Sequence, residues 1–478
     1  MSAASVLMSL LCGAVAAQVP SSGPWTLEAA VREALAGSPE VRAAEKRLAE
    51  AALEEPALLA ELDTTFESGF SYADDRGPRS APAFQGSRSQ TESWDLGFVQ
   101  KTLLGTDARL KASSSRLTNP TPFRTADPTV DSRLNLTISQ PLWRYFAGRP
   151  DIARRRRARA GTAAAESLLR QAREDSVLRA SRAFLEWRHA LDLVRINQGG
   201  VTDAKALLAK YEDKRRYGLV EEGDLLQAQA SLESQEILLL VSVSRVETAR
   251  HAVVAALNRP GMDLPEPERG SVERPGALDG LSDEEAVSGL PGLAAARQRR
   301  ERAEWDHRVS VLDTYPDLRL QAGYGFSGLS GRAGPSWSDV GGWRHPVASV
   351  GATFSIPLGY RRERLTRRAA LLRLEAAAAE ESSSHTAALR ERRDAREALK
   401  LARRRMEVGL RLIAIERRKF AAEETQFKRG RSSTDLLLRS QQDIRRAETE
   451  LLRAQTDEAL ARVEYARASG RLASELAP

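Results

Sequence analysis

The chain of 478 residues lacks the patterns that most enzymes and metal sites need. Its five histidines are scattered without an HExxH spacing, and a single cysteine, Cys12, is all that could join them. Its glycines form no phosphate-binding loop, and no Ser/His/Asp arrangement can be argued. We therefore predict that the protein is not an enzyme, with no catalytic residues, no metal and no cofactor.

Cys12 lies in an apolar N-terminal segment that ends in small residues. Such a segment resembles a secretory signal peptide, which we expect over residues 1–17; the alternative is an ordinary amphipathic N-terminus. If the segment is removed, the mature chain has no thiol and therefore no disulfide.

Aromatic residues make up only 5% of the chain, and no run after residue 20 approaches 18 consecutive apolar residues. The second absence excludes a membrane-spanning helix. Ala, Leu, Arg and Glu dominate instead, which is typical of long helices. The net charge is +7, but acidic and basic residues alternate nearly everywhere. The basic run Arg154–Arg159 begins a helix just after a predicted strand. Contact with acidic lipid headgroups and plain solvation both explain it, and we predict no nucleic-acid partner.

The sequence contains two copies of one pattern, and we predict repeats over residues 18–257 and 281–478, joined by a Pro/Gly-rich linker over 258–280. Four pairs of segments recur in the same order. They are EAAVREALAGSPEVRAAEKR from Glu28 with EEAVSGLPGLAAARQRR from Glu284, DTTFESGFSY from Asp63 with DLRLQAGYGF from Asp317, LNLTISQPL from Leu134 with VGATFSIPL from Val350, and GLVEEGDLLQAQ from Gly218 with GRSSTDLLLRSQ from Gly430.

Alternating side chains predict two strands in each repeat, over 62–74 and 132–141 and over 316–327 and 347–357. The first repeat is longer by about 38 residues, which contain an additional hairpin over 93–116, around Gly105. One face of every strand is apolar and the other is polar. A half-buried soluble sheet explains this pattern, and so does a membrane sheet.

The number of strands favours several chains if the sheet lies in a membrane. The chain provides four strands, or six with the hairpin, whereas the smallest closed membrane barrels have about eight. Open sheet edges are not tolerated in lipid, so several chains would have to share one barrel.

Four long helices are predicted, over 151–217, 224–257, 361–429 and 435–474, because apolar residues repeat in steps of three and four without an internal proline. Helices of such length form coiled coils rather than a globular core. Each repeat is therefore expected to contain a helical hairpin with its tip near Gly218 or Gly430.

Together, the signal peptide, the duplicated strand–helix units, the SQPL and SIPL junctions and the Gly-then-Asp-Leu-Leu tips resemble the TolC-like outer-membrane efflux and secretion channels. In that family three chains share a 12-stranded outer-membrane β-barrel, which a long α-helical barrel continues into the periplasm. The resemblance implies an α+β membrane protein, a homotrimer located in the cell outer membrane and surrounded by its lipid. It also implies a periplasmic adaptor protein and an inner-membrane transporter as partners.

By position, the resemblance assigns three groups of residues. The adaptor-contacting helical tips fall on Tyr217, Gly218, Leu219, Val220, Asp224, Leu225, Gly430, Arg431, Ser432, Asp435 and Leu436. The junctions between barrel and helices fall on Pro141, Trp143 and Pro357, and a candidate periplasmic gate falls on Glu416, Glu423 and Glu424. For the two aspartates, capping of the returning helix is the simpler interpretation. At Pro141 we expect the strand to run directly into the helix, because proline ends a strand ladder and suits a first helical turn.

The predicted function is a passive exit duct of a tripartite efflux pump or a type I secretion system. The alternative is an exported periplasmic coiled-coil scaffold without channel activity. Whether the cargo is a drug, a metal, a dye or a polypeptide stays open, and so does whether the extra hairpin adds strands to the barrel.

Overall fold

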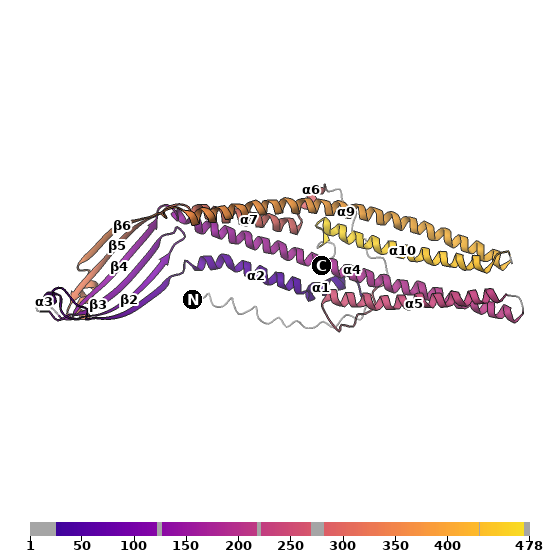
Figure 1. Cartoon of the computed structure of the whole chain (residues 1–478), viewed down its shortest axis with the longest axis horizontal. Coiled ribbons are helices and arrows are strands. Elements are labelled where there is room, and N and C mark those ends of the chain that lie inside the picture. The colour runs from indigo at the N-terminus through magenta and orange to yellow at the C-terminus, as the bar shows by residue number, and fades with distance from the viewer. Residues whose placement is uncertain (1–24, 122–126, 218–220, 269–281, 430, 473–478) are drawn as a thin grey trace. The chain divides into compact units, whose positions relative to one another are not determined.

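The computed structural model describes residues 25–121, 127–217, 221–268, 282–429 and 431–472 (Figure 1). The chain divides into two compact units. One unit comprises Met1–Val41, Ala172–Ala286 and Glu391–Pro478, and the other comprises Arg42–Gln171 and Val287–Arg390. Each unit therefore takes segments from both predicted repeats, because the longest helices run from one unit into the other. Within the described ranges, no helix is apolar and long enough to cross a membrane.

The second unit contains an antiparallel six-stranded sheet whose spatial order follows the chain (Figure 1). Its strands are β1 Thr65–Asp75, β2 Ser89–Lys101, β3 Asp107–Thr118, β4 Thr129–Pro141, β5 Asp317–Ser330 and β6 Pro346–Ser355. The extra hairpin predicted from the sequence is β2–β3, and it lies inside the sheet between β1 and β4. Both of its strands therefore belong to the sheet.

The strand register joins the apolar side chains into one continuous face. A single row runs across all six strands and contains Phe66, Phe98, Leu110, Leu136, Tyr324 and Ala348. The five larger side chains of this row are 42–57% exposed. The neighbouring row, on the opposite face, contains Thr65, Val99, Arg109, Thr137, Gly323 and Ser349. The alternation read within single strands is therefore in phase across the whole sheet.

A short helix, α8 (Ala333–Gly341), packs on β4 and β5 at the end of the sheet where β5 finishes. The Ser336 hydroxyl donates to the Gly328 carbonyl at 2.7 Å, and Trp337 stacks on Trp94 with ring centroids 5.7 Å apart. Gly328 is small enough for this approach, since a Cβ there would lie 2.0 Å from the Ser336 carbonyl oxygen. This helix covers one end of the apolar face and leaves the middle of that face exposed.

The same unit contains helical segments that begin or end beside the sheet. They are most of α2 (Pro39–Ala60), α3 (Pro82–Gln85), the 3-10 turn η1 (Phe146–Gly148), α7 (Pro291–Leu312) and the first parts of α4 (Arg149–Arg216) and α9 (Arg361–Lys428). Ion pairs link helices that are far apart in the sequence. Arg155 of α4 lies 3.0 Å from Glu55 of α2, and Arg300 of α7 lies 3.0 Å from Glu381 of α9.

The first unit contains α1 (Leu27–Gly37), α5 (Glu222–Leu257), α10 (Thr434–Ala468), α6 (Asp283–Ser288) up to Ala286, and the remaining parts of α4 and α9. Its core joins Trp25 and Val31 to Phe184, Trp187 and Leu257. The Trp25 ring meets the Phe184 and Trp187 rings edge-on at 5.8 and 6.2 Å. Ion pairs connect α9 to α10 and α4 to α5, for example Lys419 to Asp443 at 2.7 Å and Lys205 to Glu236 at 3.1 Å.

A buried cation anchors α6 to α9 and α10. The Arg392 side chain is fully buried, and its Nε donates to Asp283 at 3.0 Å while its Nη1 donates to the Ser469 hydroxyl at 2.9 Å. The hydrogen bond from Arg392 holds the pKa of the Asp283 carboxyl below its ordinary value of 3.8. The charged form of Asp283 therefore stabilises the folded state.

This ion pair predicts a loss of stability in acid. The folded chain binds a proton at Asp283 more weakly than the unfolded chain does. The charged Asp283 carboxylate therefore stabilises the folded state fully at a pH above its ordinary pKa. This stabilisation is lost as the pH falls through the lower folded pKa, so thermal unfolding followed by circular dichroism should show a falling melting temperature below about pH 4. Asp283→Asn should lose this part of the pH dependence, whereas Asp394→Asn, at an exposed carboxylate of α9, should keep it. Equal pH profiles for the two variants would contradict this role of Asp283.

Candidate channel wall, junction and helical tips

The first junction between sheet and helix contains a turn that the sequence did not lead us to expect. Pro141 is the last residue of β4, where it lies opposite Arg319, but α4 begins only at Arg149. The residues between them form a turn and η1, in which Ala147 and Gly148 have φ of 53° and 67°. The prediction that Pro141 also opens the helix is wrong. Pro150, in the first turn of α4, provides the fixed φ that suits a helix start.

The second junction is also a turn. Strand β6 ends at Ser355, so Pro357 lies beyond the strand and not at its end as predicted. Gly359 and Tyr360 then adopt φ of 101° and 49° before α9 begins at Arg361. Trp143, a predicted junction residue, is 50% exposed beside the first junction.

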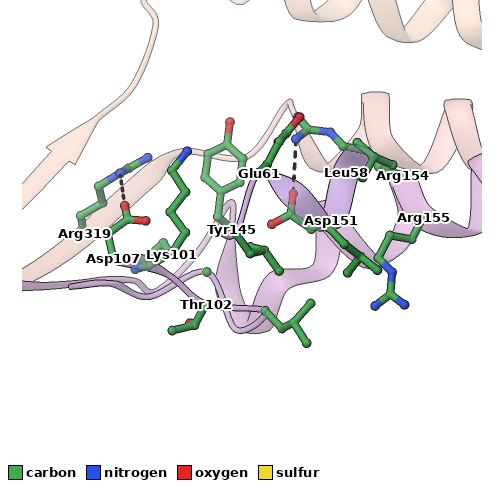
Figure 2. Close-up of a pocket in the computed structure, with 15 residues that line it drawn as sticks. Leu58, Glu61, Lys101, Thr102, Asp107, Tyr145, Asp151, Arg154, Arg155 and Arg319 are labelled. Atoms are coloured by element: carbon green, nitrogen blue, oxygen red, sulfur yellow. Dashed lines mark hydrogen bonds and ion pairs between the residues drawn. The ribbon is translucent and has the colours of Figure 1, made fainter. Parts of the chain in front are cut away.

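A cavity of about 240 Å³ lies at the first junction, between the β2–β3 turn, the end of α2 and the start of α4 (Figure 2). Figure 2 shows Tyr145 in the middle of its wall, with an Arg319–Asp107 pair on one side and an Arg154–Asp151 pair on the other. These pairs are 3.8 and 3.3 Å long, and the Arg319 guanidinium is 5.8 Å from the centre of the Tyr145 ring. The charged groups in this wall are paired with each other, which is typical of a structural contact. We call this contact between the hairpin turn and the junction turn the joint.

The joint depends on two glycines that bring the hairpin turn and the junction turn into contact. Gly105 has φ of 79°, and a Cβ there would lie 2.9 Å from the Tyr145 carbonyl oxygen. Gly148 has φ of 67°, and a Cβ there would lie 1.9 Å from the Leu103 carbonyl oxygen. Both the left-handed conformation and the close backbone contact require glycine.

We expect Gly148→Ala to destabilise this joint by about 1–3 kcal/mol, because the new Cβ meets backbone that cannot rotate away and the positive φ adds strain. Thermal unfolding of the purified protein in detergent measures the loss. Gly334→Ala is the matched control, since a Cβ at Gly334 has nothing within 4 Å. Similar melting temperatures for both variants would show that the turns are not held together at Gly148.

The structure describes part of each helical tip. Tyr217, Arg431 and Leu436 are exposed, and the Tyr217 and Leu436 side chains are 75% and 49% accessible. Leu225 is only 4% exposed and packs inside the unit. It therefore cannot form the partner contact that the resemblance implied. Four predicted tip residues, Gly218, Leu219, Val220 and Gly430, lie outside the described residues.

The predicted capping role of the two aspartates is also corrected. Helix α10 is capped by Ser433, whose hydroxyl accepts from the Leu436 N–H at 3.4 Å. Helix α5 follows Glu221, whose side chain makes no capping hydrogen bond. Asp224 and Asp435 lie in the first turns of these helices, where their negative charges complement the helix dipole. Asp435 also pairs with Arg439 at 2.9 Å.

A buried cluster ties the two tips together. It contains Leu207, Tyr211, Leu225, Ala228, Leu437 and Leu438, with Phe420 and Phe427 packed against it. The Tyr211 hydroxyl lies 2.6 Å from the Thr434 hydroxyl, and burial raises the pKa of the Tyr211 phenol. Gln227 donates to Asp435 at 3.2 Å across the same seam. Sequence reasoning missed Tyr211 and Thr434, although both are within about two helical turns of the predicted tips.

The candidate gate glutamates each have a partner in the structure. Glu416 lies 3.3 Å from Lys419, and Glu424 lies 2.9 Å from Lys428. Glu423 accepts a hydrogen bond from the Ser432 hydroxyl. A gate formed by these residues would therefore consist of partly neutralised carboxylates, one of them bonded to a predicted tip residue.

Residues 284–474 match the family model described as outer membrane efflux protein. The match confirms the predicted resemblance to TolC-like channels and the predicted location in the outer membrane. A search of curated proteins found no relative of this chain.

Solved structures agree with this fold over nearly the whole chain. The chain is similar to CusC, with 14% identity, a TM-score of 0.70 and coverage of 93% of this chain and 91% of the other. It is similar to the outer-membrane channel OprN, with 20% identity, a TM-score of 0.70 and coverage of 93% and 89%. It is also similar to the open state of the MtrE outer-membrane channel of Neisseria gonorrhoeae, with 18% identity, a TM-score of 0.68 and coverage of 93% and 89%.

Proposed function

We propose that this chain is one subunit of a trimeric outer-membrane channel, which serves as the passive exit duct of an efflux pump or a type I secretion system. The observation that carries the proposal is the six-stranded sheet, whose middle exposes a continuous apolar face. Such a face is stable against lipid, and the sheet has too few strands to close on itself in a membrane. Neighbouring copies would complete the wall.

The long helices support the same assembly. On α9, Leu401, Val408 and Ile415 are spaced seven residues apart and are 60%, 47% and 59% exposed. A heptad stripe of apolar residues is typical of a coiled-coil seam that faces another helix. A neighbouring copy would cover this stripe and extend the helices into a periplasmic barrel.

The remaining partners are those that the resemblance to TolC-like channels implies. An inner-membrane transporter would deliver the substrate, and a periplasmic adaptor protein would contact the exposed tip residues Tyr217, Arg431 and Leu436. Glu416, Glu423 and Glu424 would lie near the closed end of the duct. Separation of the tips would open it.

Cell fractionation and size measurement in mild detergent test the proposal. We expect the protein in the outer-membrane fraction, as a trimer. Recovery in the soluble periplasm, or as a monomer in detergent, would contradict it and favour the alternative of a periplasmic coiled-coil scaffold.

A further inference from the structure

The two outer strands of the sheet, β1 and β6, differ from the inner strands in the exposure of their apolar side chains. Phe70 on β1 and Val350 on β6 are 76% and 81% exposed, whereas Leu110 and Leu136 on the inner strands are 42% and 43% exposed. Among the described strands, β1 pairs only with β2 and β6 pairs only with β5. Both outer strands therefore present a row of backbone N–H and C=O groups, together with apolar side chains, that lack a neighbour.

The directions of these edges suit each other. Every neighbouring pair in the sheet is antiparallel, and five pairings separate β1 from β6. The two edge strands consequently run in opposite directions. The β6 edge of one copy can thus pair with the β1 edge of the next copy in the same antiparallel pattern, and identical copies can repeat this contact around a ring.

The register of the sheet determines which residues would meet. The row that starts at Thr65 on β1 passes through Val99, Arg109, Thr137 and Gly323 and reaches Ser349 on β6. Strand β6 continues for about six more residues to Ser355, toward the end of the sheet where β1 begins. In a symmetric ring the strands of all copies end at the same level. The last residue of β6, Ser355, should therefore lie opposite the first residue of β1, Thr65, of the next copy.

This register satisfies two independent conditions. A displacement of about six residues per six strands corresponds to a strand tilt of about 35°, from a rise of about 3.3 Å per residue and a strand spacing of about 4.8 Å. Closed membrane barrels have tilts of roughly 35–45°. Because the displacement is even, it also keeps the faces in phase. Val350 would lie opposite Phe70 and Phe354 opposite Phe66 on the apolar face.

We propose that β6 of one copy pairs with β1 of the next with Ser355 opposite Thr65, and that three copies close a barrel of three times six, or eighteen, strands. The inference rests on the proposed trimeric channel, and it replaces the twelve strands that the resemblance implies. The inserted hairpin β2–β3 would supply two of every six strands in the wall. Eighteen strands leave a water-filled lumen.

The polar face of the hairpin would then line this lumen. Its Asp95 and Lys111 form an ion pair of 3.4 Å, and both lie on the face opposite Leu96 and Leu110. Arg109 lies on the same polar face, in the row of Thr65 and Thr137.

Engineered disulfides test the register directly. Phe70→Cys and Val350→Cys are combined in one chain that also carries Cys12→Ser, and the full-length protein is oxidised in isolated outer membranes. Within one copy the two positions are separated by about 24 Å across the strands and by about 20 Å along them, so any disulfide joins neighbouring copies. We expect non-reducing gels to show linked dimers and linked trimers, with the trimer as the largest species. The control, Phe66→Cys with Val350→Cys, is displaced by four residues and should stay unlinked.

The outcomes separate this inference from the proposed function. Membrane-embedded trimers without the 70–350 disulfide, linkage of the displaced pair instead, or linked species larger than trimers would overturn the inference alone. Absence of trimers from the outer membrane, in the unmodified protein as well, would overturn the proposed function.

Discussion

Leu136→Arg is expected to prevent assembly of the protein in the outer membrane. Leu136 lies on the inner strand β4, between Leu110 and Tyr324, in the middle of the apolar face, and its side chain is 43% exposed. If this face contacts lipid, an arginine there costs about 2–4 kcal/mol in each copy. The amount of trimer recovered from outer membranes should therefore fall sharply.

The neighbouring residue offers a matched control. Thr137 is next to Leu136 on the same strand, but its side chain lies on the polar face in the row of Arg109. Thr137→Arg adds the same charge to a face that already holds charged groups, so assembly should be close to that of the unmodified protein. If both variants assemble equally well, the apolar face does not lie against lipid.

Tyr211→Ala is expected to separate the helical tips. Tyr211 is 3% exposed and packs among leucines of α4, α5 and α10, and its hydroxyl meets the Thr434 hydroxyl at 2.6 Å. Removal of a buried aromatic ring costs about 3–5 kcal/mol through lost transfer free energy and the cavity that remains. Hydrogen exchange of the tip residues should therefore become much faster, while exchange near Trp187 should be nearly unchanged.

Two further variants separate packing from hydrogen bonding at this position. Tyr211→Phe keeps the ring and loses only the hydroxyl contact, so we expect a smaller loss of about 1 kcal/mol. Tyr217→Ala removes an exposed side chain of the same type and should leave tip exchange unchanged. Wild-type exchange rates in Tyr211→Ala would show that the cluster does not hold the tips closed.

Several features of the fold were predictable because they depend on local periodicity. Strand side chains alternate with period two, so the apolar residues of LNLTISQPL had to share one side whatever the strand paired with. Long proline-free stretches with apolar steps of three and four likewise predicted helices close to the observed α4 and α9. The Gly105 hairpin was visible as a turn between two alternating runs.

The errors occurred where neighbours distant in sequence decide the conformation. Pro141 and Pro150 both suit the start of a helix, but α4 begins at Arg149, beside Pro150. Gly148, directly before this start, lies close to the Leu103 carbonyl of the hairpin turn, a contact between residues far apart in the sequence. Leu225 was assigned to an exposed tip, yet it is buried in a cluster with leucines of α10. Ser433 caps α10 where Asp435 was expected, because the helix begins at Thr434.

The sequence by itself determined the two faces of each strand, the lengths of the helices and the absence, after residue 20, of an apolar run long enough to cross a membrane. These properties follow from side-chain spacing along a regular backbone and need no partner. Only the tertiary structure decided that the inserted hairpin lies inside the sheet, that the rows are in phase over six strands, and which edges lack a neighbour. Strand order and register are set by hydrogen bonds and packing between segments far apart in the chain, which no local pattern encodes.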